Sequence, residues 1–116
     1  DGDLIFANFV EFDSLFGHRR DVVGFASALE NFDLKIGKLL SIINPNDFVI
    51  ITADHGNDPT FSGTDHTRER VPVLMVGNYA KRGNNGNITF SDVGTTMAGF
   101  LCLNGKLKGK NIFENE

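Results

Sequence analysis

Apolar and polar positions divide the chain into alternating strand-like and helix-like segments. Residues 4–12 are mostly apolar and run into Asp13, which predicts a largely buried strand that ends on an acidic side chain. After a polar loop over residues 14–20, Asp21 is suited to cap a helix. Apolar residues then recur at steps of three and four, as in a helix packed on a sheet. These positions are Val22, Phe25, Ala26, Leu29, Phe32, Ile36, Leu39, Leu40 and Ile43.

The second half of the chain continues the alternation. The Asn-Pro-Asn run at residues 44–46 is expected to stop the helix, and residues 47–53 read as the next strand. Strand, helix and strand in this order predict a parallel crossover unit. Residues 71–76 are expected to form a third strand, and Ser91 is suited to cap a last helix that stops at residues 104–105. The pattern predicts one α/β domain with a mostly parallel sheet flanked by helices.

All three histidines of the chain lie near aspartates. His18 follows Asp13 by five positions, His55 is adjacent to Asp54, and His66 is adjacent to Asp65. Imidazole and carboxylate groups together suit zinc, manganese or iron. The last two histidines also belong to a long polar segment, residues 55–70, and loops of this length are usually functional or disordered. The pattern indicates a metal site whose ligands come from several segments of the chain.

Each residue also has a plain structural interpretation. Asp13 could cap a turn, and His18 could belong to a basic surface patch with the two arginines that follow it. Gly56 could supply a positive φ in a tight turn after a buried strand. Asp58 and Asp65 could orient an imidazole from outside the metal's ligand shell, or simply cap turns in the loop.

Composition narrows the function classes. The net charge of −4 argues against a nucleic-acid-binding protein, which normally has a basic face. No apolar stretch approaches the roughly 20 residues that span a bilayer, so no membrane segment is expected. The single cysteine, Cys102, excludes an internal disulfide framework, and a cytoplasmic location is the default.

Three segments resemble the phosphopentomutase family of the alkaline phosphatase superfamily. They are NFVEFDSLFGHRRD at residues 8–21, TADHGNDPT at residues 52–60 and TDHTRE at residues 64–69. The related cofactor-independent phosphoglycerate mutases share a Thr-Ala-Asp-His-Gly-Asn segment, but their upstream aspartate and histidine are four positions apart. The five-residue step to His18 and the Arg-Arg-Asp run after it favour the pentomutases.

The resemblance implies a two-metal site that holds two manganese ions, with other divalent metals as possible substitutes. Asp13, His18 and His66 would bind one ion, and Asp54 with His55 would bind the other. It also implies that residues 1–116 are the carboxyl-terminal part of the metal-binding catalytic core. The cap domain, a further aspartate ligand and the threonine that carries the phosphoryl group would then lie in preceding sequence, so no catalytic nucleophile is assigned here.

The function implied is the interconversion of ribose or deoxyribose 1-phosphate and 5-phosphate through a phosphoenzyme, as part of nucleoside catabolism. The partner would be a small pentose phosphate, with no nucleic acid or membrane involved, and the sequence does not define an oligomeric state. A chain with these segments alone is expected to be inactive. Two alternatives stay open, namely another metal-dependent phosphomutase or phosphatase of the superfamily, and a non-catalytic metal-binding module.

Overall fold

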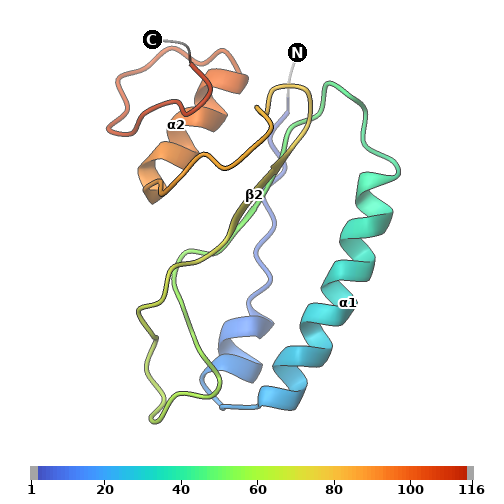
Figure 1. Ribbon diagram of the computed structural model, residues 1–116, viewed down its shortest axis with the longest axis vertical. Coiled ribbons are helices and arrows are strands. Elements are labelled where there is room, and N and C mark those ends of the chain that lie inside the picture. The colour runs from blue at the N-terminus through green and yellow to red at the C-terminus, as the bar shows by residue number, and fades with distance from the viewer. Residues whose placement is uncertain (1–2, 115–116) are drawn as a thin grey trace. The chain divides into compact units, whose positions relative to one another are not determined.

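The computed structural model describes residues 3–114 (Figure 1). These residues form two compact units, here called the site unit and the aromatic unit. The site unit comprises residues 3–44 and 52–73, and the aromatic unit comprises residues 45–51 and 74–114. The elements in chain order are η1 (Phe12–Gly17), α1 (Val22–Leu40), β1 (Val49–Thr52), β2 (Val73–Val76) and α2 (Phe90–Phe100). Residues 1–2 and 115–116 lie outside the described part, so the outermost bounds of the predicted domain, including the start at Asp1, stay predictions.

β1 and β2 pair with each other in a two-stranded sheet, and the pairing is antiparallel. Asn78, which follows β2, donates its backbone N–H to the carbonyl of Pro45, which precedes β1. Beyond the other ends of the strands, Gly56 and Thr67 form an antiparallel bridge. Both strands lie where the sequence predicts them, but the expected mostly parallel sheet is not found among residues 3–114. A parallel pair needs a crossover connection, and the connection from β1 to β2 is a returning loop without a helix.

The strand predicted over residues 4–12 is wrong. Residues 3–9 form neither helix nor strand, and η1 begins at Phe12. Two aromatic residues of this segment, Phe9 and Phe12, pack on α1 instead of on neighbouring strands. Phe9 and Phe12 meet Phe32 at ring-centroid distances of 5.1 and 5.9 Å, and Phe12 meets Phe25 at 5.5 Å. Edge-to-face packing of this kind accounts for the two aromatic residues, whereas Leu4, Ile5 and Phe6 are exposed.

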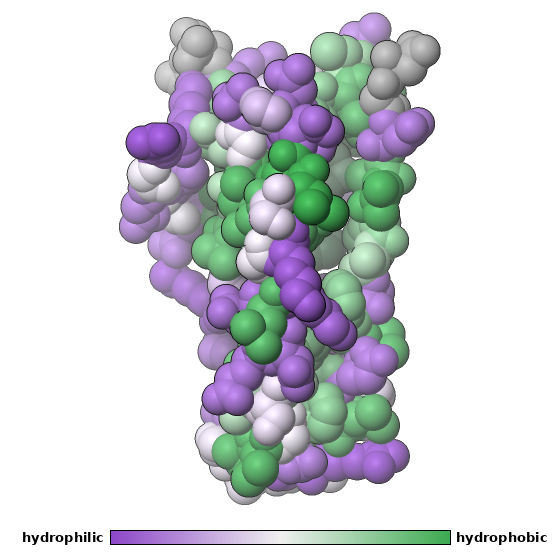
Figure 2. Space-filling model, turned by 90° about the vertical axis from the view of Figure 1, so that its right-hand side faces the viewer, coloured by the Kyte–Doolittle hydropathy of each residue, from purple (hydrophilic) through white to green (hydrophobic). Residues whose placement is uncertain are grey.

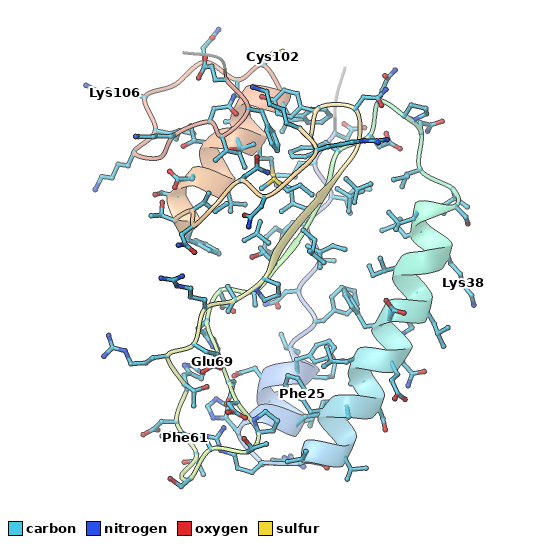
Figure 3. The ribbon with its side chains drawn as sticks, in the orientation of Figure 1. Phe25, Lys38, Phe61, Glu69, Cys102 and Lys106 are labelled. Atoms are coloured by element: carbon cyan, nitrogen blue, oxygen red, sulfur yellow. The ribbon has the colours of Figure 1, made fainter. Side chains whose placement is uncertain are left out.

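The helix predicted after Asp21 is confirmed as α1. The carboxylate of Asp21 accepts the backbone N–H of Gly24 at 2.8 Å, which satisfies one of the free donors of the first turn. α1 ends at Leu40, a few residues before the Asn-Pro-Asn run that was expected to stop it. In Figure 3, Phe25 lies on the side of α1 that faces η1, and Lys38 points outward. Figure 2, seen from the α1 side, shows apolar and polar residues interspersed on that surface.

The aromatic unit is built around four rings. Phe48 lies within 5.2 Å of both Tyr79 and Phe100, and Phe113 packs against Phe48 and Tyr79 at 6.1 and 5.7 Å. Thr96 of α2 is fully buried, and its hydroxyl accepts the N–H of Ile112 at 3.1 Å. These contacts fix α2 and the carboxyl-terminal segment of the unit.

The last helix differs from its predicted limits at both ends. Its cap is Thr89, not Ser91, because Asp92 reaches back to the N–H and the hydroxyl of Thr89 in a capping box. The helix ends at Phe100, before the predicted stop at residues 104–105. Cys102 lies after the helix, is exposed and has a φ of 54°. Among residues 3–114, no helix has both the length and the apolar character needed to cross a membrane.

Candidate metal centre

Asp13 and His18 share one side of a π-helical turn. The backbone N–H of His18 donates to the carbonyl of Asp13 at 2.9 Å, the five-residue hydrogen bond that defines a π turn. This bond places the two side chains one above the other, with Nε2 of His18 3.4 Å from Oδ2 of Asp13. The five-residue step noted in the sequence therefore follows from the geometry of η1.

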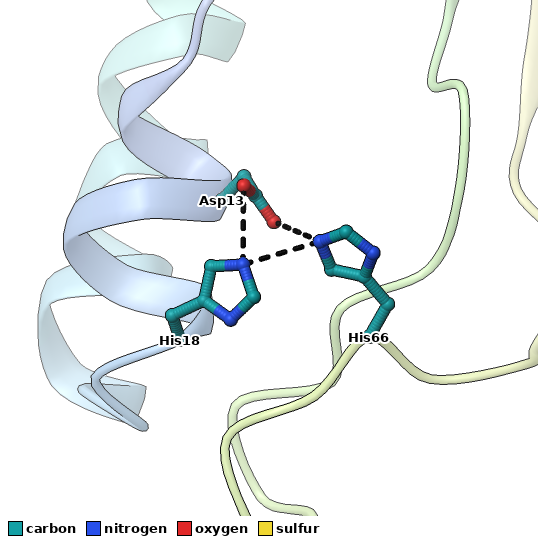
Figure 4. Close-up of side chains that lie close together, drawn as sticks. All are labelled: Asp13, His18 and His66. Atoms are coloured by element: carbon teal, nitrogen blue, oxygen red, sulfur yellow. Dashed lines mark hydrogen bonds and ion pairs between the residues drawn. The ribbon is translucent and has the colours of Figure 1, made fainter.

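His66 comes to this pair from the returning limb of the long loop (Figure 4). Its Nε2 lies 3.2 Å from Oδ1 of Asp13 and 3.1 Å from Nε2 of His18. The three candidate ligand atoms all lie within 4.8 Å of one another. The Asp13 and His18 side chains are each 37% exposed and that of His66 is 47% exposed, so solvent and ions reach the centre.

The spacing of the Asp13 carboxylate and the two imidazole nitrogens suits a single divalent cation. Atoms bound about 2.1 Å from one ion are about 3.0 Å apart at the right angles of an octahedron and about 3.4 Å apart in a tetrahedron. The 3.1 Å between the two Nε2 atoms falls in this range. So do the 3.4 Å from His18 Nε2 to Oδ2 of Asp13 and the 3.2 Å from His66 Nε2 to Oδ1, so each imidazole faces a different oxygen of the carboxylate. One carboxylate and two imidazoles are also a ligand set that manganese, iron and zinc accept.

His18 is held in the form that a metal ligand requires. Its Nδ1 faces the backbone carbonyl of Thr64, which can only accept, so this nitrogen carries a proton. In the neutral ring the opposite nitrogen, Nε2, is then the one left to bind a metal, and it faces Asp13 and His66. A hydrogen bond of this type sets both the tautomer and the orientation of a ligating histidine.

Asp54 and His55 form a second pair next to the first three residues. The His55 ring stacks on the His66 ring with centroids 3.7 Å apart, and its Nε2 lies 3.6 Å from Oδ2 of Asp54. Nδ1 of His55 faces the carbonyl of Gly56 at 3.2 Å, so in the neutral ring Nε2, on the side of Asp54, is again the nitrogen that can bind a metal. Four of the five predicted residues thus lie in direct contact, and Asp54 joins them through His55.

Asn57 is the main neighbour of the Asp13 carboxylate outside the histidines. Its Nδ2 donates to Oδ1 of Asp13 at 2.6 Å. Burial on its own would raise the pKa of Asp13, but this hydrogen bond and the positive charge that neighbouring imidazoles carry when protonated outweigh burial and lower it. Asp13 is therefore an ionised oxygen donor aimed at the histidines.

Some residues around the centre have roles that the sequence did not reveal. Asn57 was part of the quoted segment, so its position was a signal, but the Thr64 carbonyl is a backbone group that no pattern marks. Gly56 does not have a positive φ; a side chain there would instead collide with Glu69, which Figure 3 labels on the loop. Asp58 caps a turn, because its Oδ1 accepts both the N–H and the hydroxyl of Thr60.

Comparison with known proteins agrees with a metal centre. A family model described as the Metalloenzyme superfamily matches residues 1–105. The chain belongs to the Metalloenzyme superfamily. Among curated proteins, this member of the superfamily is similar to the phosphopentomutases of Yersinia pestis bv. Antiqua (strain Angola) and Yersinia pseudotuberculosis serotype O:1b (strain IP 31758), with 50% identity to each over 113 residues.

The match covers almost all of this chain but only about a quarter of the length of each relative. It covers 97% of the chain and 28% of each relative. These matches confirm the resemblance to phosphopentomutases noted in the sequence. Because the chain covers only part of each relative, the activity of the relatives is proposed for this chain below.

Proposed function

We propose that this chain supplies most of the metal ligands of a phosphopentomutase. In this proposal Asp13, His18 and His66 hold one manganese ion, and Asp54 and His55 contribute to a second. The observation that carries the proposal is the convergence of one carboxylate and two imidazole nitrogens at 3.1–3.4 Å, together with 50% identity to phosphopentomutases. The identity of the metal and the number of ions are part of the proposal.

The proposed reaction interconverts ribose or deoxyribose 1-phosphate and 5-phosphate through a phosphoenzyme. Bound divalent ions would supply positive charge where a phosphoryl group is transferred. The chain's own contribution is to keep Asp13 ionised through Asn57 and His18 in its ligating tautomer through Thr64. No threonine here is assigned the phosphoryl-carrying role, which we place in sequence that the relatives have beyond the matched 28%.

Three further parts of the proposal concern context. We propose that the two-stranded sheet belongs to a larger α/β core of the alkaline phosphatase type, in which other strands pair in parallel. The substrate would be a small pentose phosphate rather than a nucleic acid, and the enzyme would act in the cytoplasm in nucleoside catabolism. The 50% identity to phosphopentomutases supports the first two points.

A chimera tests the function. Residues 3–114 would replace the matching segment of the Yersinia pestis relative, and conversion of ribose 1-phosphate to ribose 5-phosphate would be followed with manganese present. We expect the chimera to convert the substrate and the isolated chain to bind manganese without converting it. The control is the same chimera with Asp13→Ala, which should be inactive because the carboxylate is the only oxygen donor among the three converging ligand atoms.

The products separate the alternatives. Release of inorganic phosphate without ribose 5-phosphate would contradict a mutase and favour a phosphatase, because water rather than a sugar oxygen would then accept the phosphoryl group. A chimera without any turnover, but with manganese bound as tightly as in the relative, would favour a non-catalytic metal-binding module.

A further inference from the structure

Arg20 lies just after the turn that carries Asp13 and His18, and its guanidinium reaches across to the long loop. NH1 donates to the carbonyl of Asp58 at 2.7 Å, and NH2 donates to the carbonyl of Asp65 at 2.6 Å. Nε donates to the carbonyl of Gly63. One side chain therefore binds the backbone of the loop at three points, all of them carbonyls that face the same planar group.

The loop points that Arg20 binds are next to the residues that form the metal centre. Asp65 precedes His66, and Gly63 precedes Thr64, whose carbonyl orients the His18 ring. The contacts thus fix the two loop groups that complete the centre. Because the arginine fork is planar and presents its donors in fixed directions, it holds the carbonyls in one arrangement.

A fourth contact links Arg20 to the Asp13 carboxylate. NH1 also donates to Oδ1 of Asn57 at 2.8 Å, and Nδ2 of the same amide donates to Oδ1 of Asp13 at 2.6 Å. The arginine decides which way the Asn57 amide faces, since its positive charge requires the amide oxygen on its side. The amide N–H groups are then left to face Asp13.

The backbone at this position supports a specific role for the side chain. Arg20 has a φ of 55°, a left-handed conformation that residues other than glycine adopt rarely. It is half-buried, whereas the neighbouring Arg19 is exposed. A glycine would adopt this conformation more readily, so the backbone alone does not account for an arginine here.

We propose that Arg20 is a positioning residue that sets the distance from His66 to Asp13 and His18 and the orientation of Asn57, an inference that rests on the metal site of the proposed function. It touches none of the three ligand atoms. Its effect passes through the loop carbonyls on one side and through the Asn57 amide on the other.

The test uses the chain with Arg20→Gly, which keeps the left-handed backbone and removes the guanidinium. Arg20→Lys retains the positive charge but lacks the planar guanidinium group. Arg19→Ala is the matched control. In the metal-free proteins, nuclear Overhauser contacts between the His18 and His66 rings, whose centroids lie 4.8 Å apart, report the position of the loop. We expect these contacts in the wild-type chain and in Arg19→Ala, and their loss in both Arg20 variants.

A manganese titration followed by electron paramagnetic resonance gives the second readout. We expect the two Arg20 variants to bind manganese about 10- to 100-fold more weakly, the usual effect of losing a group that orients metal ligands. Wild-type ring contacts and affinity in either Arg20 variant would overturn the inference, as would loss of the α1 signal in circular dichroism, which would assign Arg20 to the general fold. If the wild-type chain binds no manganese, the metal site fails, while the metal-free ring contacts still decide the role of Arg20.

Discussion

The imidazole rings of His55 and His66 stack with centroids 3.7 Å apart and an angle of 23° between their planes. In the proposed function these rings serve different manganese ions. A shared stack places two sets of ligands side by side, as a pair of metals about 4 Å apart requires. His55 therefore has two separable properties, a ring that supports His66 and a nitrogen that is free to bind a cation.

Substitution of His55 by phenylalanine is expected to separate these properties. His55→Phe keeps an aromatic ring against His66 but has no Nε2, so binding of the first manganese ion should change little and that of the second should be lost. His55→Ala removes both properties and should also weaken the first ion. Isothermal titration calorimetry of the active chimera measures both ions. Equal loss of both ions in His55→Phe would show that the stack does not act independently of the nitrogen.

Loss of His18 should affect binding far more than folding. His18→Ala removes one of three converging ligand atoms, so we expect manganese affinity to fall by about 100-fold or more and chimera activity to disappear. Because the side chain is 37% exposed, little packing is lost, and the thermal midpoint should stay close to that of the wild type. Manganese binding and circular dichroism melting check the two parts. Wild-type turnover would refute the ligand assignment.

The sequence predicted the grouping of the site better than its scaffold. The proximity of Asp13, His18, His55 and His66 followed from the rarity of histidine and its position beside aspartates. Residues 4–12 were assigned to a strand because an apolar run has the same appearance whether it pairs in a sheet or packs on a helix. Phe9 and Phe12 pack on a helix, and only their tertiary contacts with α1 distinguish this packing from pairing in a sheet.

The groups that orient the candidate metal ligands could not be predicted from the sequence, for a different reason. The π turn at η1 depends on a backbone hydrogen bond, and the orientation of His18 depends on the Thr64 carbonyl, which every residue type possesses. In the sequence, Arg20 could belong to a basic surface patch with His18 and Arg19. Its contacts with Gly63, Asp58 and Asp65 arise from a loop about 40 positions away, a distance at which local sequence patterns carry no information.

Gly17 is expected to tolerate no side chain. A Cβ at this position would lie 2.5 Å from Nδ2 of Asn57 and 2.8 Å from the carbonyl of Phe12. Gly17→Ala should therefore push Asn57 away from Asp13 and reduce the free energy of unfolding by about 1–3 kcal/mol, the usual effect of overpacking. Manganese affinity should fall as well. Urea unfolding and manganese titration measure these changes.

Gly37 provides the matched control for that substitution. It lies within α1, and a Cβ there would meet no atom within 4 Å. Gly37→Ala should raise the free energy of unfolding by about 0.5–1 kcal/mol, because alanine favours the helical conformation, and should leave manganese affinity unchanged. Similar effects of the two substitutions would contradict the close approach of Asn57 to Gly17.

The capping box of α2 predicts that the stability of the protein depends on pH through Asp92, a residue that is not among the proposed metal ligands. Hydrogen bonds from the N–H of Lys110 and from the N–H and hydroxyl of Thr89 lower the pKa of Asp92 below its ordinary value of 3.8. The folded state therefore favours the carboxylate. The stabilisation is fully present above the unfolded pKa and is lost as the pH falls through the lower folded pKa. Asp92→Asn should lower the thermal midpoint at pH 7, and the difference from the wild type should shrink below pH 3.8.

Asp33→Asn is the control for this titration, because Asp33 is an exposed carboxylate on α1. Circular dichroism melts at pH 7 and at pH 3 would be recorded for the wild type and both variants. The Asp33 variant should follow the wild type at both pH values, since no cap depends on it. A destabilisation by Asp92→Asn that is the same at pH 3 and pH 7 would mean that shape rather than ionisation of the side chain holds the cap, and the electrostatic explanation would then be wrong.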